Sequence, residues 1–546
     1  MSKKDKHVSA VVVGAGAGGG VVAKELAVNG IQTVLFERGG WANYDNMPND
    51  ELTSMRGPMN RPLAPDRKKN PRYRIIGKGE NQKFVLDNGY GSHIGHNVGS
   101  GLVSYGAMAW RFMREDFKMV STYGEVADST LADWPISYED LEHCYERAEW
   151  EIGVSGSDQH NPFAPPRKKD YPMPPFEQNE DGKMLADACK RLGLNPFPIP
   201  MARNSIPYNG RAGCIRNRTC AGYVCPVDAK NGTQNSVIPV AIASGNCELR
   251  THCKVAEVLV DDDGKARGVR YFDKDDKERI QPADIVVVAA SAIETARLLL
   301  NSKSRKFPNG AGNNNDVVGR NLQGHAYTGA IAFFKDDVHR FSGPGATFAI
   351  CDFNHHNEGI IGGGLLANEF YKLPYAFTRT RPHGSPRWGA EHKKFQRDNF
   401  FKFSQMVGPI QEIPNYNSRV QVYDGVKDFW GRPVPAFSGA RHPLDHEHCK
   451  FLSAKAEMIL KEAGAEWTTQ HVGGRGQGTG VHQVGTCRMG DDPTTSVTNR
   501  FGQVHDIDNL WIGDGSTFVT NAGFNPALTI LAMGFWVGEN MVKKYT

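Results

Sequence analysis

Three glycines close to the start of the chain have the spacing that binding of a dinucleotide requires. Gly14, Gly16 and Gly19 satisfy the pattern GxGxxG, and Glu37 follows 18 residues after Gly19. The first glycine permits a tight turn, the second lets the backbone approach a pyrophosphate, and the third lets a helix pack closely on a sheet. The helix N-terminus offers unpaired N–H groups to the phosphates, and Glu37 would accept hydrogen bonds from ribose hydroxyls. The pattern predicts a dinucleotide site and does not distinguish FAD from NAD.

A cluster of three cysteines is the second group of residues that could carry chemistry. Cys214, Cys220 and Cys225 are separated by five and four residues, and Pro226 follows the last of them. Three thiolates suffice to hold a three-iron cluster, and a proline after the last cysteine is typical of ferredoxins. The same thiols can instead be structural. We favour the structural interpretation, keep an iron–sulfur cluster as the alternative, and find little in this spacing that suits zinc.

The elements around the glycines form a β–α–β unit, which places a parallel sheet in the fold. A buried strand is predicted at residues 8–13, a helix at 18–29 and a second strand at 31–36. A later strand and helix are predicted at 284–289 and 292–300, and the chain closes with a strand at 510–512 and a helix at 526–544. A nucleotide-binding fold that is split by insertions explains this order.

Two long stretches separate these units. Residues 42–92 show little periodicity and are predicted to be a loop that is functional or lies across another domain. Residues 331–475 carry aromatic and alternating segments, such as 418–423, and are predicted to be an antiparallel, β-rich insertion. The fold class predicted from the residues is therefore α/β with a β-rich insertion.

Composition excludes several classes of protein. The 546 residues include 64 basic and 60 acidic side chains, a formal net charge of +4, which gives no electrostatic reason to expect nucleic acid as a partner. At about 150 residues per domain the length predicts two to four domains or one composite fold. The longest apolar run, residues 527–537, falls short of the roughly 20 residues that a membrane span needs. Ten cysteines in so long a chain do not form a disulfide framework.

Motifs near the carboxyl end carry a resemblance to a known family. Residues 481–490 read VHQVGTCRMG, residues 509–516 read NLWIGDGS, and residues 525–530 read NPALTI. With the glycine pattern, these resemble the glucose–methanol–choline (GMC) family of flavin oxidoreductases. Further segments that look like the family are 133–138, 289–295 and 318–322. Residues 110–112 and 116–118 look most like the bacterial sugar dehydrogenases that act on fructose, gluconate or glucose, and the segment around the cysteines looks as much like pyranose and glycoside 3-oxidases.

The resemblance implies a discontinuous domain organisation. A Rossmann-like FAD-binding domain would be assembled from residues 1–120, 205–330 and 476–546. A substrate-binding domain that contains an antiparallel sheet would comprise residues 121–204 and 331–475.

The resemblance also implies the roles of individual residues. His482 would be the base that takes the proton of the substrate hydroxyl, and Asn525 would lie beside it as the second group that holds the hydroxyl. Asn525 could instead merely cap the last helix, because Pro526 follows it. The N-terminus of that helix would point at the flavin, where negative charge grows on reduction. The residues expected to contact the cofactor are Gly14, Gly16, Gly19, Glu37, Asn97, Ser100, Val255, Ala290, Asp514, Gly515 and Pro526.

The cofactor implied is FAD, bound without a covalent link. Where sugar enzymes with covalent flavin carry a histidine, this chain has Ser104, although His93 and His96 lie a few residues upstream. Bacterial fructose and glucose dehydrogenases carry an iron–sulfur cluster in the region of Cys214, Cys220 and Cys225, with a different spacing. Asn217 stands where many family members without a recognised cluster have another cysteine.

The function implied is FAD-dependent oxidation of a sugar or glycoside hydroxyl, with a hydride passing to the flavin N5. The alternatives are a dehydrogenase or oxidase of a non-sugar alcohol, such as a sterol or a choline-like cation, an oxygen-using glycoside 3-oxidase, and a flavin-binding scaffold that has lost catalysis. The expected partners are a small-molecule sugar, an electron acceptor that the sequence does not identify, and a small partner subunit. The start of the chain lacks a signal-peptide core, so we expect a cytoplasmic protein, or a periplasmic one if a signal-bearing partner subunit exports it.

Overall fold

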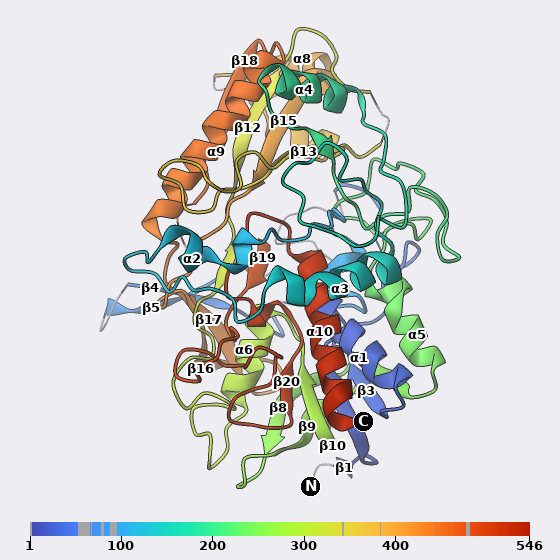
Figure 1. Ribbon diagram of the computed structural model, residues 1–546, viewed down its shortest axis with the longest axis vertical. Coiled ribbons are helices and arrows are strands. Elements are labelled where there is room, and N and C mark those ends of the chain that lie inside the picture. The colour runs from blue at the N-terminus through green and yellow to red at the C-terminus, as the bar shows by residue number, and fades with distance from the viewer. Residues whose placement is uncertain are drawn as a thin grey trace.

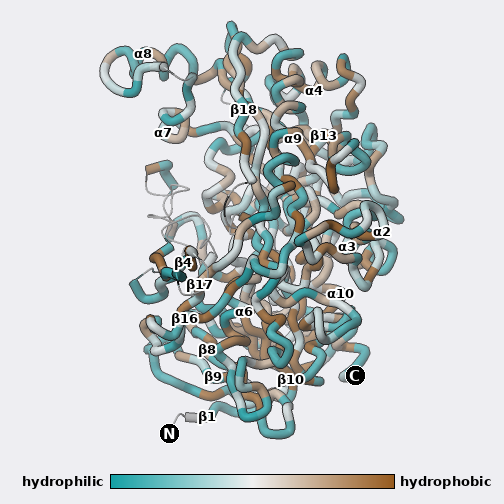
Figure 2. The backbone as a smooth tube through the Cα atoms, turned by 90° about the vertical axis from the view of Figure 1, so that its left-hand side faces the viewer, coloured by the Kyte–Doolittle hydropathy of each residue, from teal (hydrophilic) through white to brown (hydrophobic). Residues whose placement is uncertain are grey.

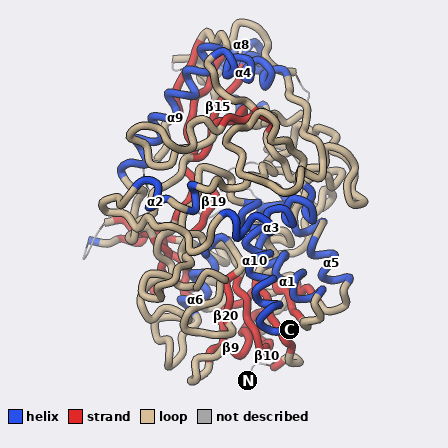
Figure 3. The backbone as a smooth tube through the Cα atoms, viewed as in Figure 1, coloured by secondary structure: helices blue, strands red, loops and turns tan. Residues whose placement is uncertain are grey.

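The chain folds into two parts that are stacked along the long axis of the molecule (Figure 1). The computed structural model describes residues 3–47, 49–52, 66, 68–77, 81–87, 95–340, 343–382, 384–474, 476 and 481–546. Both termini lie at the lower end of the molecule in this view, and strands gather in a lower and an upper zone (Figures 1 and 3).

The lower part is built on an eight-stranded sheet whose centre is parallel. Its strands are β1 (Lys3–Lys4), β2 (Val8–Val13), β3 (Thr33–Phe36), β7 (Cys247–Arg250), β8 (Lys254–Val260), β9 (Ala266–Phe272), β10 (Glu278–Val288) and β20 (Leu510–Ile512). The parallel strands run in the order β7, β3, β2, β10, β20. Strand β10 changes partners along its length, because its first half pairs antiparallel with β9 and its second half pairs parallel with β2 and β20.

Helices cover both faces of this sheet, as a parallel sheet requires. One face packs against α1 (Ala17–Val28), α5 (Val237–Ala243) and α10 (Ala527–Tyr545), and the other packs against α6 (Ala292–Asn301). Successive strand residues alternate between the two cores: Val12 faces α1 and α10, and Val11 and Val13 face α6. The strands and helices predicted for this part are confirmed, except that β3 starts at Thr33 and β10 starts earlier, at Glu278.

The upper part is built on a six-stranded sheet that is antiparallel throughout, as predicted for the insertion. Its order is β18 (Trp467–His471), β12 (Tyr327–Phe333), β15 (Phe403–Pro409), β14 (Leu366–Asn368), β13 (Phe348–Ile350) and β6 (Phe197–Pro198). One face carries the buried side chains of Ala330 and Met406 and packs against α9 (Pro443–Glu462), a helix that the sequence reading missed. The opposite face carries Phe333 and Phe403, which pack against Phe377.

Two smaller sheets join the parts. One is four-stranded, in the order β16 (Arg419–Lys427), β17 (Pro433–Ser438), β4 (Tyr73–Ile76) and β5 (Lys83–Leu86). The other pairs β11 (Gln323–His325) with β19 (Val481–Val484). The prediction of a loop for residues 42–92 is thus wrong for β4 and β5. Strand β4 pairs with β17, which is far away in the sequence, and β5 pairs with β4.

The remaining helices lie around the two sheets. They are α2 (Met119–Tyr123), α3 (Tyr138–Ala148), α4 (Glu180–Arg191), α7 (Pro374–Phe377) and α8 (Gly389–Asn399). Helices α7 and α8 project from the upper part, and α8 is largely hydrophilic (Figure 2). The predicted domain boundaries stay a prediction; strand β12 begins at Tyr327, shortly before the boundary predicted at residue 330.

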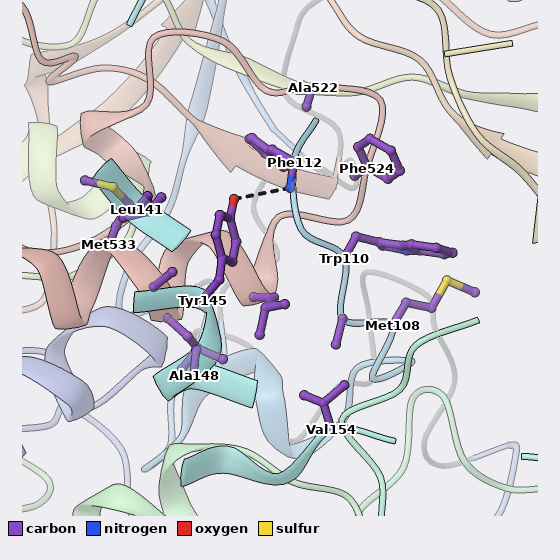
Figure 4. Close-up of a cluster of buried hydrophobic side chains, with 14 of the residues drawn as sticks. Met108, Trp110, Phe112, Leu141, Tyr145, Ala148, Val154, Ala522, Phe524 and Met533 are labelled. Carbon is purple, nitrogen blue, oxygen red and sulfur yellow. Dashed lines mark hydrogen bonds between the residues drawn. The ribbon is translucent and has the colours of Figure 1, made fainter. Parts of the chain in front are cut away.

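One hydrophobic cluster fixes the segment that runs from Ala107 to Phe117 between the two parts (Figure 4). Phe112 from this segment packs near Tyr145 of α3 and Phe524 from the loop before α10. The backbone N–H of Phe112 donates a hydrogen bond of 3.2 Å to the Tyr145 hydroxyl. The cluster therefore holds Trp110, two residues earlier, at a fixed position.

Candidate active site and cofactor cavity

A cavity of about 1210 Å³ lies between the two parts of the molecule. Of the residues predicted to serve the cofactor or the chemistry, the following line it: Gly14, Gly16, Glu37, Ser100, Val255, Ala290, His482, Asp514, Gly515, Asn525 and Pro526. Gly19, Asn97 and the three cysteines do not line it. The fold thus brings most of the predicted residues to one place from distant parts of the chain.

The glycine-rich loop between β2 and α1 has no room for side chains. A Cβ at Gly14, whose φ is +106°, would lie 2.3 Å from the carbonyl oxygen of Ala289. A Cβ at Gly19 would lie 2.0 Å from the carbonyl oxygen of Gly14, so α1 can approach the sheet only with glycine here. Gly18, which the pattern did not single out, is tighter still, with a Cβ 1.7 Å from the Gly513 carbonyl oxygen.

Two long helices direct their N-termini at this cavity. Gly16 is the N-cap of α1 and Pro526 is the N-cap of α10, and both line the cavity. Neither helix has a side-chain acceptor at its cap, and neither has an acidic residue in its first turn. Their first N–H groups and the positive ends of their dipoles are therefore open to an anionic ligand.

Two buried carboxylates are held at the cavity wall. Glu37 accepts hydrogen bonds from the backbone N–H groups of Ala15, at 3.1 Å, and Gly39, at 2.9 Å. Asp514 accepts from the backbone N–H of Ser291 at 2.8 Å and from the Thr295 hydroxyl at 2.6 Å. Burial raises the pKa of both carboxyl groups, and these hydrogen bonds oppose the increase.

The loop that carries Asn97 and Ser100, both expected to contact the cofactor, is ordered by its own side chains. The side-chain amide of Asn97 donates to the carbonyl oxygens of Val98, at 2.9 Å, and Ser100, at 3.1 Å. Its predicted contact with the cofactor stays a prediction. His96 lines the cavity and hydrogen-bonds to Arg38, and burial lowers the pKa of its ring well below the usual value. His93 lies outside the described residues.

The small β11–β19 ribbon places two histidines side by side. His325 ends β11 and His482 lies in β19, and their Nδ1 atoms are 2.9 Å apart. His482 has a φ of +62°, which is uncommon for a residue with a side chain and indicates that the surrounding structure imposes this conformation. The sequence reading missed His325, because nothing in its local sequence distinguishes it among 18 histidines.

Hydrogen bonds fix the protonation of this pair. The Nε2 atom of His325 lies 2.8 Å from the carbonyl oxygen of Ala522, and a carbonyl can only accept, so Nε2 carries the proton. Burial lowers the pKa of His325, so its ring is neutral and its Nδ1 accepts from the Nδ1–H of His482. The Nε2 atom of His482 is therefore left with a lone pair.

The hydrogen bonds of Asn525 also indicate that Nε2 of His482 carries the lone pair. The indole N–H of Trp110, which can only donate, lies 3.1 Å from Oδ1 of Asn525. The amide nitrogen of Asn525 consequently faces the hydroxyl of Tyr327, at 2.7 Å, and Nε2 of His482, at 3.4 Å. Asn525 is not the cap of α10, whose N-cap is Pro526, so the cap interpretation is wrong.

Burial keeps His482 neutral. Burial and, to a lesser extent, the neighbouring His325 hold the pKa of His482 well below its usual value. A neutral imidazole with a lone pair on Nε2, beside an amide N–H, can accept a proton from a hydroxyl group. The arrangement is therefore suited to proton abstraction.

A buried carboxylate, Glu412, holds the backbone on both sides of His325. Glu412 accepts hydrogen bonds from the backbone N–H groups of Gly324, at 3.2 Å, and Ala326, at 2.8 Å, on either side of His325. Arg441 pairs with Glu412 at 2.5 Å. The sequence gives no signal for this support, since it joins residues that are about a hundred positions apart.

The three clustered cysteines lie on a loop next to the cavity. Backbone N–H groups lie 3.3 Å from the sulfur atoms of Cys214 and Cys225, and Arg203 lies 3.8 Å from that of Cys220. The three sulfur atoms do not all fall within 4.8 Å of one another, whereas a single zinc ion needs thiolates about 4 Å apart. All ten cysteines are free thiols.

Comparison with known proteins identifies the family. Two family profiles, both described as GMC oxidoreductase, match residues 129–327 and 414–534, and together they span more than half of the chain. The chain belongs to the GMC oxidoreductase family, as the carboxyl-terminal motifs predicted. It is an FAD-dependent oxidoreductase that acts on CH–OH donors.

Curated relatives match nearly the whole chain. The 6'''-hydroxyparomomycin C oxidase of Streptomyces lividus is 29% identical and is matched over 97% of this chain and 90% of its own. The 2-methyl-1,2-propanediol dehydrogenase of Mycolicibacterium austroafricanum is 27% identical and is matched over 100% of this chain and 97% of its own. The gluconate 2-dehydrogenase flavoprotein of Pantoea cypripedii is 27% identical and is matched over 99% of this chain and 94% of its own.

A solved structure confirms the fold class. An FAD-dependent oxidoreductase from Chaetomium thermophilum superposes with a TM-score of 0.65 at 13% identity, covering 98% of this chain and 99% of that one. The predicted combination of a Rossmann-like sheet and an antiparallel insertion is therefore confirmed. Among the helices in the described part of the chain, none has the length and apolar character to cross a bilayer.

The residues at the cavity fit FAD. The glycine loop and the open N-terminus of α1 suit a pyrophosphate, and Glu37 suits a ribose. Ser291 also lines the cavity, and its buried hydroxyl oxygen has no hydrogen-bond partner within the protein. A buried polar atom without a partner is costly, so a ligand that pairs with it is favoured.

Proposed function

We propose that this protein oxidises a hydroxyl-bearing carbon of a sugar or glycoside, with His482 as the base. The observation that carries the proposal is the chain of hydrogen bonds from Ala522 through His325, which leaves the lone pair of His482 on Nε2, beside the amide of Asn525. The relatives named for paromomycin and gluconate substrates support a sugar-like substrate. The propanediol relative supports the alternative of a small non-sugar alcohol.

Two side chains, Asn525 and His482, act on the substrate hydroxyl. When bound, FAD supplies the acceptor for the hydride that leaves the carbon. The amide N–H of Asn525 donates to the substrate hydroxyl oxygen, and Nε2 of His482 takes the hydroxyl proton. The resulting imidazolium keeps its hydrogen bond from Nδ1–H to His325, whose own N–H remains on the Ala522 carbonyl. His325 thereby orients the base and stabilises its charge.

Replacement of His482 by alanine tests the base. We expect His482→Ala to retain FAD and to slow anaerobic reduction of the flavin by glucose or a methyl glucoside by about 10²- to 10⁴-fold, the usual contribution of a general base. The measurement is the bleaching of flavin absorbance in a stopped-flow instrument. The control is His160→Asn, at an exposed histidine that does not line the cavity, which should react like the wild type. Reduction of His482→Ala at the wild-type rate would show that another group is the base.

The cysteine loop is a candidate site for a [3Fe–4S] cluster, as part of the same proposal. Hydrogen bonds from backbone N–H groups to two of the sulfurs suit thiolates. Gly222, Tyr223 and Val224, between Cys220 and Cys225, line the cavity, so a cluster here would lie beside the flavin. The test is iron and acid-labile sulfide in anaerobically purified protein. About three iron atoms per chain that disappear in Cys220→Ser would support the cluster, and no iron would leave the thiols structural.

A small partner subunit that exports the protein completes the proposal. One relative is named as the flavoprotein of a gluconate dehydrogenase, a name that suits an enzyme with further components. Protein isolated from its native cells should then copurify with a smaller chain and lie in the periplasm. Isolation of the chain alone from the cytoplasm would reject this part.

A further inference from the structure

Three side chains that can bind a metal ion meet where helix α3 packs against helix α10, outside the cavity (Figure 1). They are His143 and Cys144 of α3 and Glu539 of α10. The Nε2 atom of His143 lies 2.9 Å from Oε2 of Glu539 and 3.3 Å from the sulfur of Cys144. All three of these atoms lie within 4.8 Å of one another.

The spacing of the three atoms suits a zinc ion. Zinc binds sulfur at about 2.3 Å and nitrogen or carboxylate oxygen at about 2.0–2.2 Å, in tetrahedral geometry. Two atoms bound to one such ion therefore lie about 3.3–3.7 Å apart, and shifts of about 1 Å or less bring all three onto one ion. His143 is exposed, so water can occupy the fourth position.

Neighbouring side chains already orient two of the ligands. The Oε1 atom of Glu539 accepts a hydrogen bond from Arg147 at 2.8 Å, and its Oε2 atom is directed at His143. Trp536, one turn before Glu539, stands edge-on to the His143 ring, with ring centroids 6.4 Å apart. These contacts restrict the rotamers of Glu539 and His143, as the outer partners of metal ligands do.

The ion pairs next to the site leave negative charge in excess. Arg147 pairs at 2.7–2.8 Å with three carboxylates, those of Glu25, Glu151 and Glu539. Lys24 pairs with the first two of them, at 2.8 and 2.7 Å. Lys543, one turn beyond Glu539 in α10, is exposed to water, which screens its charge. Two cations among three carboxylates leave one negative charge, which a cation beside Glu539 balances.

The thiol of Cys144 lies in the same electrostatic environment. Cys144 is buried, and burial, followed by the charge of Glu539, raises the pKa of its thiol. The free thiol therefore keeps its proton. A zinc ion replaces that proton, which passes to water, and the thiolate and the Glu539 carboxylate then balance the two charges of the ion.

We propose that His143, Cys144 and Glu539 bind one zinc ion, which joins α3 to α10. The proposal goes beyond the proposed function and does not depend on it, because none of the three residues lines the cavity. The role of the ion is structural. It stabilises the contact between α10, whose N-terminus faces the cavity, and α3, which holds Phe112 through the Tyr145 hydroxyl.

Titration of the holoenzyme with zinc tests the proposal. The purified protein is treated with EDTA, desalted and titrated with zinc chloride in an isothermal calorimeter. We expect one ion per chain, a dissociation constant below about 10 µM, and a higher melting temperature when zinc is bound. His143→Gln and Cys144→Ser should each weaken binding at least about 100-fold, because loss of an outer partner alone costs about 10- to 100-fold.

Matched variants separate this site from other places where zinc could bind. His160→Asn removes an exposed histidine elsewhere, and Cys220→Ser removes a thiol of the cysteine loop. Both should bind zinc like the wild type. His143→Gln changes an exposed side chain and keeps a donor for Glu539, so it should fold normally. Flavin content and the melting temperature without zinc verify this.

Each outcome bears on the proposal. A dissociation constant above about 100 µM, or binding that His143→Gln leaves unchanged, would overturn it. Loss of binding in Cys220→Ser with no loss in His143→Gln would place the ion on the cysteine loop and would also overturn it. In all of these cases the proposed function stands, because flavin reduction does not involve His143, Cys144 or Glu539.

Discussion

At the scale of single residues, the direction of each hydrogen bond decides what His482 can do. An imidazole is a base only at the nitrogen that lacks a proton. Two groups, each of which can act only as an acceptor or only as a donor, determine which nitrogen that is. The Ala522 carbonyl can only accept and the Trp110 indole can only donate. His325 contacts Nδ1 of His482 and Asn525 contacts Nε2, so their hydrogen bonds fix the proton on Nδ1 and leave the lone pair on Nε2.

His325 is therefore a positioning residue, and its replacement should change the behaviour of His482. His325→Phe removes the acceptor for Nδ1–H, and we expect the limiting rate of flavin reduction to fall at least about tenfold, equivalent to about 1.4 kcal/mol. His325→Gln offers both an acceptor and a donor and should recover part of the rate. The measurement is anaerobic stopped-flow reduction across a range of pH. A purely structural role would lower flavin content or stability and leave the pH profile of the remaining activity unchanged.

The depressed pKa of His482 predicts the pH dependence of the reaction. Only neutral His482 can take a proton, and burial favours the neutral form, so the active form persists to a lower pH than for an ordinary histidine. With a neutral glycoside as substrate, the rate of flavin reduction should stay level as the pH falls through 6.5 and decrease only at more acid pH. A decrease centred at the ordinary histidine pKa would contradict the burial argument.

At the scale of elements, the segment from Ala107 to Phe117 must be fixed on α3 for Trp110 to meet Asn525. Arg111 forms a two-pronged ion pair with Glu149, at 2.9 and 2.7 Å, just past the end of α3. Arg114 pairs with Glu139 on the same helix at 2.5 Å, but there both side chains are more than half exposed. The two arginines thus make the same type of contact in opposite environments.

These two arginines provide a matched comparison. Arg111→Met removes one of the two arginines that pair with the buried Glu149, which keeps Arg167 at 2.9 Å. The loss of these charged hydrogen bonds should lower the free energy of unfolding by about 1.5–3 kcal/mol. Arg114→Met removes an exposed pair and should cost less than about 1 kcal/mol. Denaturant unfolding of the holoprotein measures both. Equal effects would mean that the buried pair does not anchor the segment.

At the scale of the whole molecule, the cavity belongs to both parts. Its wall includes Gly14 and Asp514 from the lower sheet and its turns, and Tyr327 and Val407 from the upper sheet. A ligand that fills the cavity contacts both parts at once and favours the folded arrangement of the two together.

Removal of FAD should consequently destabilise the protein as a whole. We expect the apoprotein to melt at a lower temperature than the holoprotein, and added FAD at about 100 times its dissociation constant to restore about 2.7 kcal/mol. Differential scanning calorimetry measures the change, with NAD at the same concentration as the control ligand. A stabilisation by NAD that equals that by FAD would contradict the cofactor assignment.

The sequence by itself determined the main elements of the nucleotide-binding part and the class of chemistry. The spacing of apolar residues and the turn residues predicted the β–α–β unit at the start of the chain and the last helix, because local propensity and burial agree there. The motifs predicted the family and brought His482 and Asn525 into consideration. Only the tertiary structure decided that Asn525 faces His482 instead of capping a helix, and that His325 sets the protonated nitrogen. Such contacts join residues far apart in the chain, and local sequence carries no information on which distant groups will meet.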